Sequence, residues 1–170
     1  MIKFHRAKAK RAAVPKAAIT GYVQKRLEEL QVQLPARPMK NGEPLSPRLP
    51  GDLTALNDIK LGQLYSEFCT VAQWAKAQLA VLSVEKSIAK YADRLLRSQT
   101  HLIKEGTVPD KAAQVESDSE VVKVYIDCLK TEGVEAITAA VLDGYIIGKD
   151  ACSRELTRRQ AVGELNTLQR

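Results

Sequence analysis

The sequence of 170 residues contains only two histidines and three cysteines. Cys69, Cys128 and Cys152 stand far apart, and neither His5 nor His101 completes a ligand spacing with them. Structural zinc sites need four such ligands at short, regular spacings, so we expect no metal and no cofactor. An odd cysteine number and the lack of an apolar run behind Met1 also argue against a secreted disulfide scaffold and favour the cytoplasm.

Long apolar runs and aromatic residues are also scarce. No stretch of eighteen or more apolar residues is present, so the sequence predicts no membrane-spanning segment. Aromatic residues make up 5% of the chain, while apolar residues in total reach 45%. A core of aliphatic side chains and alanine is typical of helices, and we found no run with the alternating pattern of a strand. The composition therefore predicts an all-α protein.

Catalytic signatures are missing as well. The sequence has no Gly-x-x-x-x-Gly-Lys-Ser/Thr loop and no Gly-x-Gly-x-x-Gly turn, so no segment is expected to cradle phosphate with backbone amides. His5 lies among basic residues and His101 near an expected helix end, where a polar surface role is the simpler interpretation. The carboxylates are spread over helix faces, which leaves no pair suited to acid–base chemistry. We expect no enzymatic activity.

What the sequence does have is a marked charge imbalance. Residues 1–50 contain eleven lysines and arginines against three acidic residues, whereas the other 120 hold fifteen basic and seventeen acidic residues. A basic segment of this kind is typical of a polyanion-binding arm, because each cation that reaches a phosphate releases counterions. A solvated tail, or a contact with anionic lipid or an acidic protein, would also explain it. The side chains expected to contact DNA here are Lys3, Arg6, Lys8, Lys10, Arg11 and Lys16.

Breakers divide the chain into three parts. Residues 1–34 form the basic arm and one short amphipathic helix, whose apolar positions from Ile19 to Leu34 recur every three or four residues. Residues 35–51 hold five prolines and two glycines, and we expect a linker or strap without regular structure there. Residues 52–170 carry the long helical patterns and are expected to form a hairpin domain for oligomerisation.

The hairpin prediction follows from two long periodic runs around one turn. Thr54 or Asn57 can cap a first helix that extends to about Ile103, with a kink possible near Leu82. Gly106 and Pro109 mark the turn, where Gly106 suits a positive φ and Pro109 a first helical position. A second run then continues to the end of the chain, with bending expected near Gly144 and Gly148. The sequence predicts two long antiparallel helices.

Apolar side chains lie on more than one side of both runs. A two-helix hairpin cannot bury them all, so we expect the hairpin to form homo-oligomers. Trp74 is better explained by packing in a core or subunit interface than by stacking on a base. The residues expected in the oligomer interface are Leu64, Phe68, Trp74, Ile126 and Ile146.

The most distinctive motif is Ser153-Arg-Glu-Leu-Thr-Arg-Arg near the C-terminus. Ser153 can cap a short last helix, while Arg154, Arg158 and Arg159 are spaced so that two share a face and could grip DNA phosphate. The alternative is a solvated helix end in which Glu155 pairs with Arg158 or Arg159. The sequence does not separate these two interpretations.

Four features together carry a family resemblance over about residues 45–160. They are Leu49-Pro-Gly-Asp-Leu-Thr-Ala-Leu, then Leu61-Gly-Gln-Leu-Tyr-Ser-Glu-Phe, then Trp74, and the arginine string at Ser153. With them, the chain resembles small head-gene proteins of tailed bacteriophages, especially those of actinobacteria, which are often taken to be terminase small subunits. Many members of that class carry an N-terminal helix-turn-helix, whereas residues 1–34 here hold only one expected helix.

The resemblance implies a non-enzymatic accessory protein of phage DNA packaging, helical and oligomeric, that binds duplex DNA. Its further partners would be the terminase large subunit or other phage head proteins, and its place the cytoplasm of an infected host or the virion. The main alternative is a structural virion or assembly protein, such as a scaffold, head-completion or cement component. An inhibitor of a host enzyme explains the charge less well.

Overall fold

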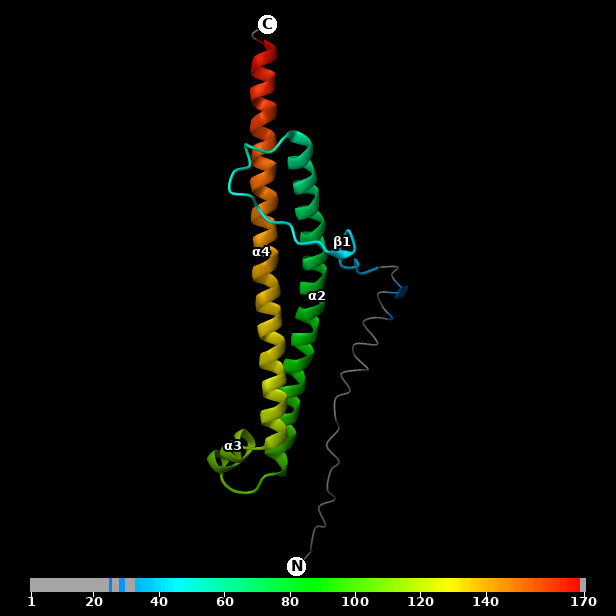
Figure 1. Cartoon of the computed structure of the whole chain (residues 1–170). Helices are drawn as coiled ribbons and strands as arrows, with labels where there is room; N and C mark the ends of the chain where they lie inside the picture. Colours follow the sequence, from blue (N-terminus) through cyan, green and yellow to red (C-terminus); the bar gives the residue numbers. More distant parts are fainter. Residues whose placement is uncertain (1–24, 26–27, 30–32, 169–170) are drawn as a thin grey trace, which may run out of the picture. The chain divides into compact units, whose positions relative to one another are not determined.

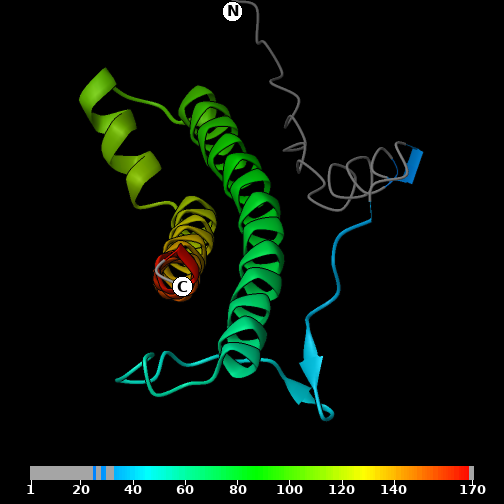
Figure 2. The same ribbon diagram turned by 90° about the horizontal axis from the view of Figure 1, so that it is seen from above.

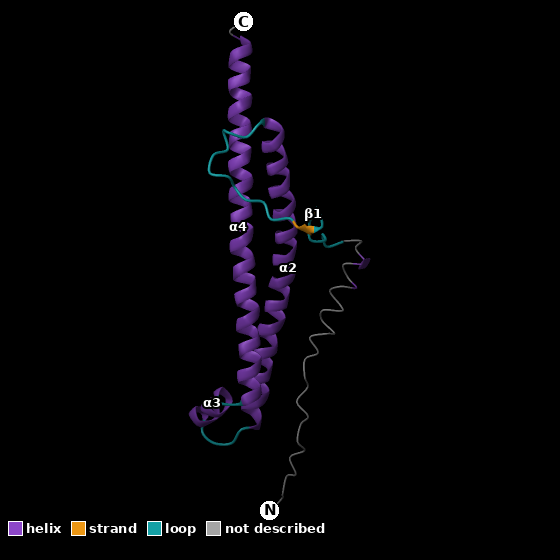
Figure 3. Cartoon of the chain, viewed as in Figure 1, coloured by secondary structure: helices purple, strands orange, loops and turns teal. Residues whose placement is uncertain are grey.

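The computed structural model describes residues 25, 28–29 and 33–168, and it is predominantly helical, as predicted (Figure 3). Helices α2 (Asp58–Ile103), α3 (Val108–Glu116) and α4 (Ser119–Leu168) follow a two-stranded sheet of β1 (Met39–Lys40) and β2 (Glu43–Pro44) (Figure 1). The two long helices confirm the all-α hairpin. The predicted DNA-contacting residues 3–16 and most of the expected helix 16–34 lie outside the described residues.

The chain divides into two compact units, and each long helix contributes to both. Of the described residues, 25, 28–29 and 85–131 belong to one unit, and 33–84 and 132–168 belong to the other. We call them the turn unit and the strap unit, because they contain the helical turn and the proline-rich strap, respectively.

In the strap unit, the first long helix starts where one of the two predicted caps stands. Asn57 accepts a hydrogen bond from the backbone N–H of Lys60 at 2.8 Å through its side-chain oxygen, which satisfies an amide that the first turn leaves without a partner. Thr54 instead belongs to a turn just before the helix, where its N–H donates to the carboxylate of Asp52. Asn57 is therefore the N-cap, and α2 begins at Asp58.

The core of the strap unit lies between α2 and α4, which run side by side (Figure 1 and Figure 2). Leu61, Phe68 and Cys152 are at most 3% exposed and form its buried cluster. The partly buried residues packed against this cluster are Leu53, Leu56, Leu64, Tyr65, Tyr145 and Leu156. Since Leu53 and Leu56 precede α2, the chain that leads into the helix is part of this core.

The strap itself contains regular structure, and the prediction that it has none was wrong. Met39 pairs with Pro44 and Lys40 with Glu43 across a tight turn in which Asn41 and Gly42 both have positive φ, 53° and 83°. An Asn-Gly pair with two positive φ angles is the preferred two-residue hairpin turn, and Pro44 is tolerated because a two-stranded sheet consists only of edge strands. The strap contacts α2 through a Lys40–Glu67 ion pair and through Arg37, which lies 5.3 Å from the ring centroid of Trp74.

In the turn unit, the connection between the long helices is itself helical. Gly106 has a φ of 118°, and Thr107 donates its backbone N–H and its hydroxyl to the carboxylate of Asp110 at the start of α3. Pro109 stands in the first turn of that helix, as predicted. The expected second run is nevertheless two helices, because α3 ends at Glu116 and α4 starts anew at Ser119. The ion pair of Lys104 with Asp118, at 3.1 Å, links the end of α2 to the start of α4.

Helix α4 is continuous from Ser119 to Leu168, which corrects one prediction. It runs without interruption through Gly144 and Gly148, because glycine lowers helix propensity but still donates and accepts backbone hydrogen bonds. Ser153 accordingly lies inside the helix and caps nothing. Among the described residues, none of the helices combines the length and the apolar character needed to cross a membrane.

Candidate assembly face and arginine cluster of helix α4

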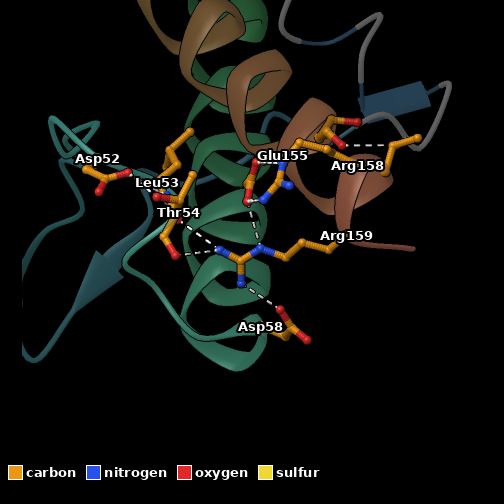
Figure 4. Close-up of polar contacts among 9 residues, drawn as sticks. Asp52, Leu53, Thr54, Asp58, Glu155, Arg158 and Arg159 are labelled. Atoms are coloured by element: carbon orange, nitrogen blue, oxygen red, sulfur yellow. Dashed lines mark hydrogen bonds and ion pairs between the residues drawn. The ribbon is translucent and has the colours of Figure 1, made fainter. Parts of the chain in front are cut away.

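Two of the three arginines expected to grip DNA pair with a carboxylate of their own helix (Figure 4). Arg158 donates from Nε and Nη2 to the two oxygens of Glu155, at 2.7 and 2.8 Å. Arg159 donates from Nε to the same carboxylate at 2.8 Å. These pairs hold the pKa of Glu155 down at about 2, Arg158 being the larger cause, so the carboxylate is ionised at neutral pH.

Arg159 also ties α4 to the chain that leads into α2. Its Nη1 donates to the carboxylate of Asp58 at 2.6 Å, and its Nη2 donates to the backbone carbonyls of Leu53 and Thr54 at 3.0 and 3.3 Å (Figure 4). Arginine suits this position because its planar fork presents several donors at once. The side chain of Arg159 is 20% exposed, so this guanidinium is committed to the fold of the strap unit.

The segment opposite Arg159 is held in shape by a local turn that sequence reasoning missed. The carboxylate of Asp52 accepts the backbone N–H of Thr54 at 2.8 Å and its hydroxyl at 2.6 Å, and these bonds lower the pKa of Asp52. An Asp followed two residues later by Thr is the sequence signal for such a turn. Leu53 and Thr54, whose carbonyls Arg159 binds, belong to this turn.

The three arginine side chains therefore differ in how far they are paired and how far they are exposed. Arg154 is exposed and donates from Nε to the backbone carbonyl of Asp150 at 3.3 Å. Arg158 pairs with Glu155 but keeps a side chain that is 56% exposed. Glu155 thus pairs locally, as the alternative interpretation of the arginine string expected. It is only 8% exposed and α4 continues to Leu168, however, so the string is not a solvated helix end. Of its three arginines, Arg154 and Arg158 remain exposed.

The five predicted interface residues are placed in different environments. Phe68 is 3% exposed inside the strap unit, and Leu64 packs partly buried against the same core. Trp74 is partly buried and lies under Arg37. Ile126 in the turn unit and Ile146 in the strap unit are 44% and 36% exposed. Of these five residues, Ile126 and Ile146 are the exposed ones.

The structure adds exposed apolar residues that the interface prediction did not include. In the strap unit, Val134, Ile137, Val141 and Ile147 of α4 are between 43% and 67% exposed. In the turn unit, Val122, Tyr125 and Leu129 of α4 are between 40% and 46% exposed. The sequence signal was the richness of α4 in apolar residues on every side, which cannot say which of its faces the partner helix covers.

The turn unit also has a hollow beside α3, lined by Arg97, His101, Val115 and Glu116 among others. The Arg97 guanidinium is paired there with Asp93 and Glu116 and lies 5.3 Å from the ring centroid of Tyr125. Its charge is already balanced, so the hollow offers no evident anion site. Within the described parts of the chain, no group of three or more His, Cys, Asp or Glu side chains could hold a metal ion.

Comparison with protein-family models, with curated proteins and with solved structures finds no match to this chain.

Proposed function

We propose that this chain is a non-enzymatic assembly protein whose copies associate through α4. The observation that carries the proposal is the set of large apolar side chains that α4 leaves exposed, with Ile137 at 67% and Ile147 at 63%. Single exposed apolar residues are ordinary, but several on one helix mark a protein–protein contact. A role as a structural virion or assembly component, of the kind that the resemblance to phage head-gene proteins also allows, fits this feature.

The second candidate is the DNA-binding role of a terminase small subunit. It is supported by the eleven basic residues against three acidic ones in residues 1–50. The C-terminal arginines do not support this role, because Arg158 and Arg159 both pair with the carboxylate of Glu155. The pair of Arg159 with Glu155 also stabilises the strap unit. In this candidate role, the basic N-terminal residues are the main DNA contacts, and Arg154 and Arg158 are secondary contacts.

One experiment separates the two candidates. The molar mass of the full chain is measured by light scattering at micromolar concentration, with and without duplex DNA. A defined oligomer whose molar mass is unchanged by DNA supports the assembly role. An oligomer whose molar mass rises because it binds DNA supports the packaging role. A monodisperse monomer under both conditions would contradict self-assembly.

The DNA candidate has its own test in the basic segment. Deleting residues 1–14 removes Lys3, Arg6, Lys8, Lys10 and Arg11. Because about 0.9 counterions are released per phosphate contact, the slope of log affinity against log salt should fall by up to roughly four. Matched affinities and slopes for the truncated and full-length chains would exclude the segment as a DNA contact.

A further inference from the structure

Helix α4 carries a second seam on its exposed side within the strap unit. We call Gly133, Ile137, Ala140, Gly144 and Ile147 the outer seam, and all five are exposed. They follow one another at steps of four, three, four and three residues, which is the spacing of core positions in a coiled coil. Leu142, Gly148 and Cys152 are buried on the side that packs inside the unit.

Among the described residues, neither a close neighbour nor the backbone conformation requires glycine at the two glycine positions of the outer seam. A Cβ added at Gly133 or at Gly144 would meet nothing within 4 Å, and neither glycine has a positive φ. Each glycine nevertheless lowers the stability of the helix relative to alanine. Small residues on a helix surface allow another backbone to approach closely, and the two isoleucines of the seam supply the side chains to fill such gaps.

We propose that the outer seam binds the outer seam of a second copy in antiparallel orientation, around a two-fold axis near Ala140. In that register, residues whose numbers sum to about 280 lie at the same level, so Ile147 lies over the partner's Gly133 and Ile137 over the partner's Gly144. Each bulky side chain then meets a small residue, and Ala140 meets its own copy. Identical surfaces that complement each other in this way are what a two-fold dimer requires.

Charge agrees with a copy of the same seam as the occupant. From Gly133 to Ile147 the helix has two charged residues, Glu135 and Asp143, and neither belongs to the seam. Two such faces can therefore meet without burying an unpaired charge, which would oppose association. The inference rests on the proposed self-assembly and names the surface and orientation that produce it.

The first test places a charge in the seam of the full-length chain. Ile137→Glu and Ile147→Glu should each raise the dissociation constant of the dimer at least about tenfold, measured by sedimentation velocity. Because both side chains are exposed in the single chain, circular dichroism should show an intact helical fold. Ile59→Glu is the matched control, since Ile59 is 72% exposed on α2 and should leave association unchanged.

A second pair of variants excludes a merely structural role of the glycines. Gly144→Ala should raise the thermal stability of the folded chain, because its Cβ enters open space, and should weaken association, because that space belongs to the partner's Ile137. Gly62→Ala on α2 also enters open space and should raise stability without changing association.

Disulfide cross-linking tests the orientation. Ala140→Cys should form a covalent dimer under mild oxidation, with the wild-type chain as the background for its native thiols. Ile147→Cys should not, because two copies of residue 147 would be about 20 Å apart in an antiparallel pair. Cross-linking of both variants would indicate a parallel pair and overturn the register.

These experiments distinguish a failure of the outer-seam dimer from a failure of self-assembly itself. A monomeric wild-type chain would overturn both. An oligomer that survives Ile137→Glu and Ile147→Glu with unchanged affinity would overturn the outer seam and leave self-assembly standing through another surface.

Discussion

The ring of Phe68 on α2 occupies the space that a Cβ at Gly148 on α4 would need. Phe68 is 3% exposed and belongs to the buried cluster of the strap unit, so the ring has no open side into which to move. Glycine at 148 thus allows a large side chain to lie against the α4 backbone.

Gly148→Ala should lower the free energy of unfolding by about 1–3 kcal/mol, the usual cost of overfilling a packed core. Gly62→Ala, whose Cβ would meet nothing within 4 Å, should instead raise it by about 0.5–1 kcal/mol. Urea denaturation of both variants measures these differences. Equal stabilisation by the two alanines would contradict the packing of Phe68 on Gly148.

Stability should fall in acid through Glu155. Folding lowers the pKa of this carboxyl from 4.5 to about 2, with Arg158 and then Arg159 as the causes. Its contribution is therefore complete above pH 4.5 and is lost as the pH falls through about 2, because protonation removes the charge that both arginines bind. Thermal unfolding between pH 2 and pH 6 measures the effect.

Glu155→Gln is the variant that isolates this group. It should be less stable than wild type at pH 6, and its stability should change less between pH 5 and pH 2. Parallel pH curves for the two chains would show that Glu155 is not the source of the acid dependence.

Arg159 should stabilise the segment before α2, and Arg158 should not. Arg159→Lys replaces a fork that reaches Asp58, Glu155 and two backbone carbonyls with a single ammonium, so the segment before α2 should lose its anchor. Hydrogen exchange of residues 53–57 should accelerate in this variant. Arg158→Lys keeps the charge beside Glu155 and serves as the control, with little change expected in that segment. Equal acceleration of hydrogen exchange in the two variants would contradict a specific role of Arg159 in holding this segment.

Replacing Thr100 with valine should increase the stability of the fold. Its side chain is 0% exposed, and its hydroxyl has no hydrogen-bond partner among the described residues, whereas the hydroxyl of Thr131 donates to the carbonyl of Asp127 at 2.9 Å. Thr100→Val should therefore raise the free energy of unfolding by about 1 kcal/mol, since burying an unpaired hydroxyl is unfavourable. Thr131→Val loses a bond and should not stabilise. Guanidinium denaturation compares the two.

Much of the fold could be predicted from the sequence because the signals are local. Each signal affects only the residues next to it in the sequence. Examples are the cap at Asn57, the apolar period that follows it, and Gly106 with Pro109 at the turn. Two local signals were misleading. The Asn41-Gly42 pair specifies a hairpin that the density of prolines obscured, and Ser153 is a favourable cap residue that lies inside α4.

The functional surface was harder to predict because it depends on which face of each helix its partner covers. By itself, the sequence determined two long helices, the turn between them and the basic excess of residues 1–50, since propensity, breakers and charge belong to the chain. Only the tertiary structure decided that Phe68 is buried while Ile137 is exposed, and that Arg159 binds Asp58, which is 101 positions away. Those outcomes depend on packing between distant segments, and apolar residues on every side of α4 are compatible with several packings.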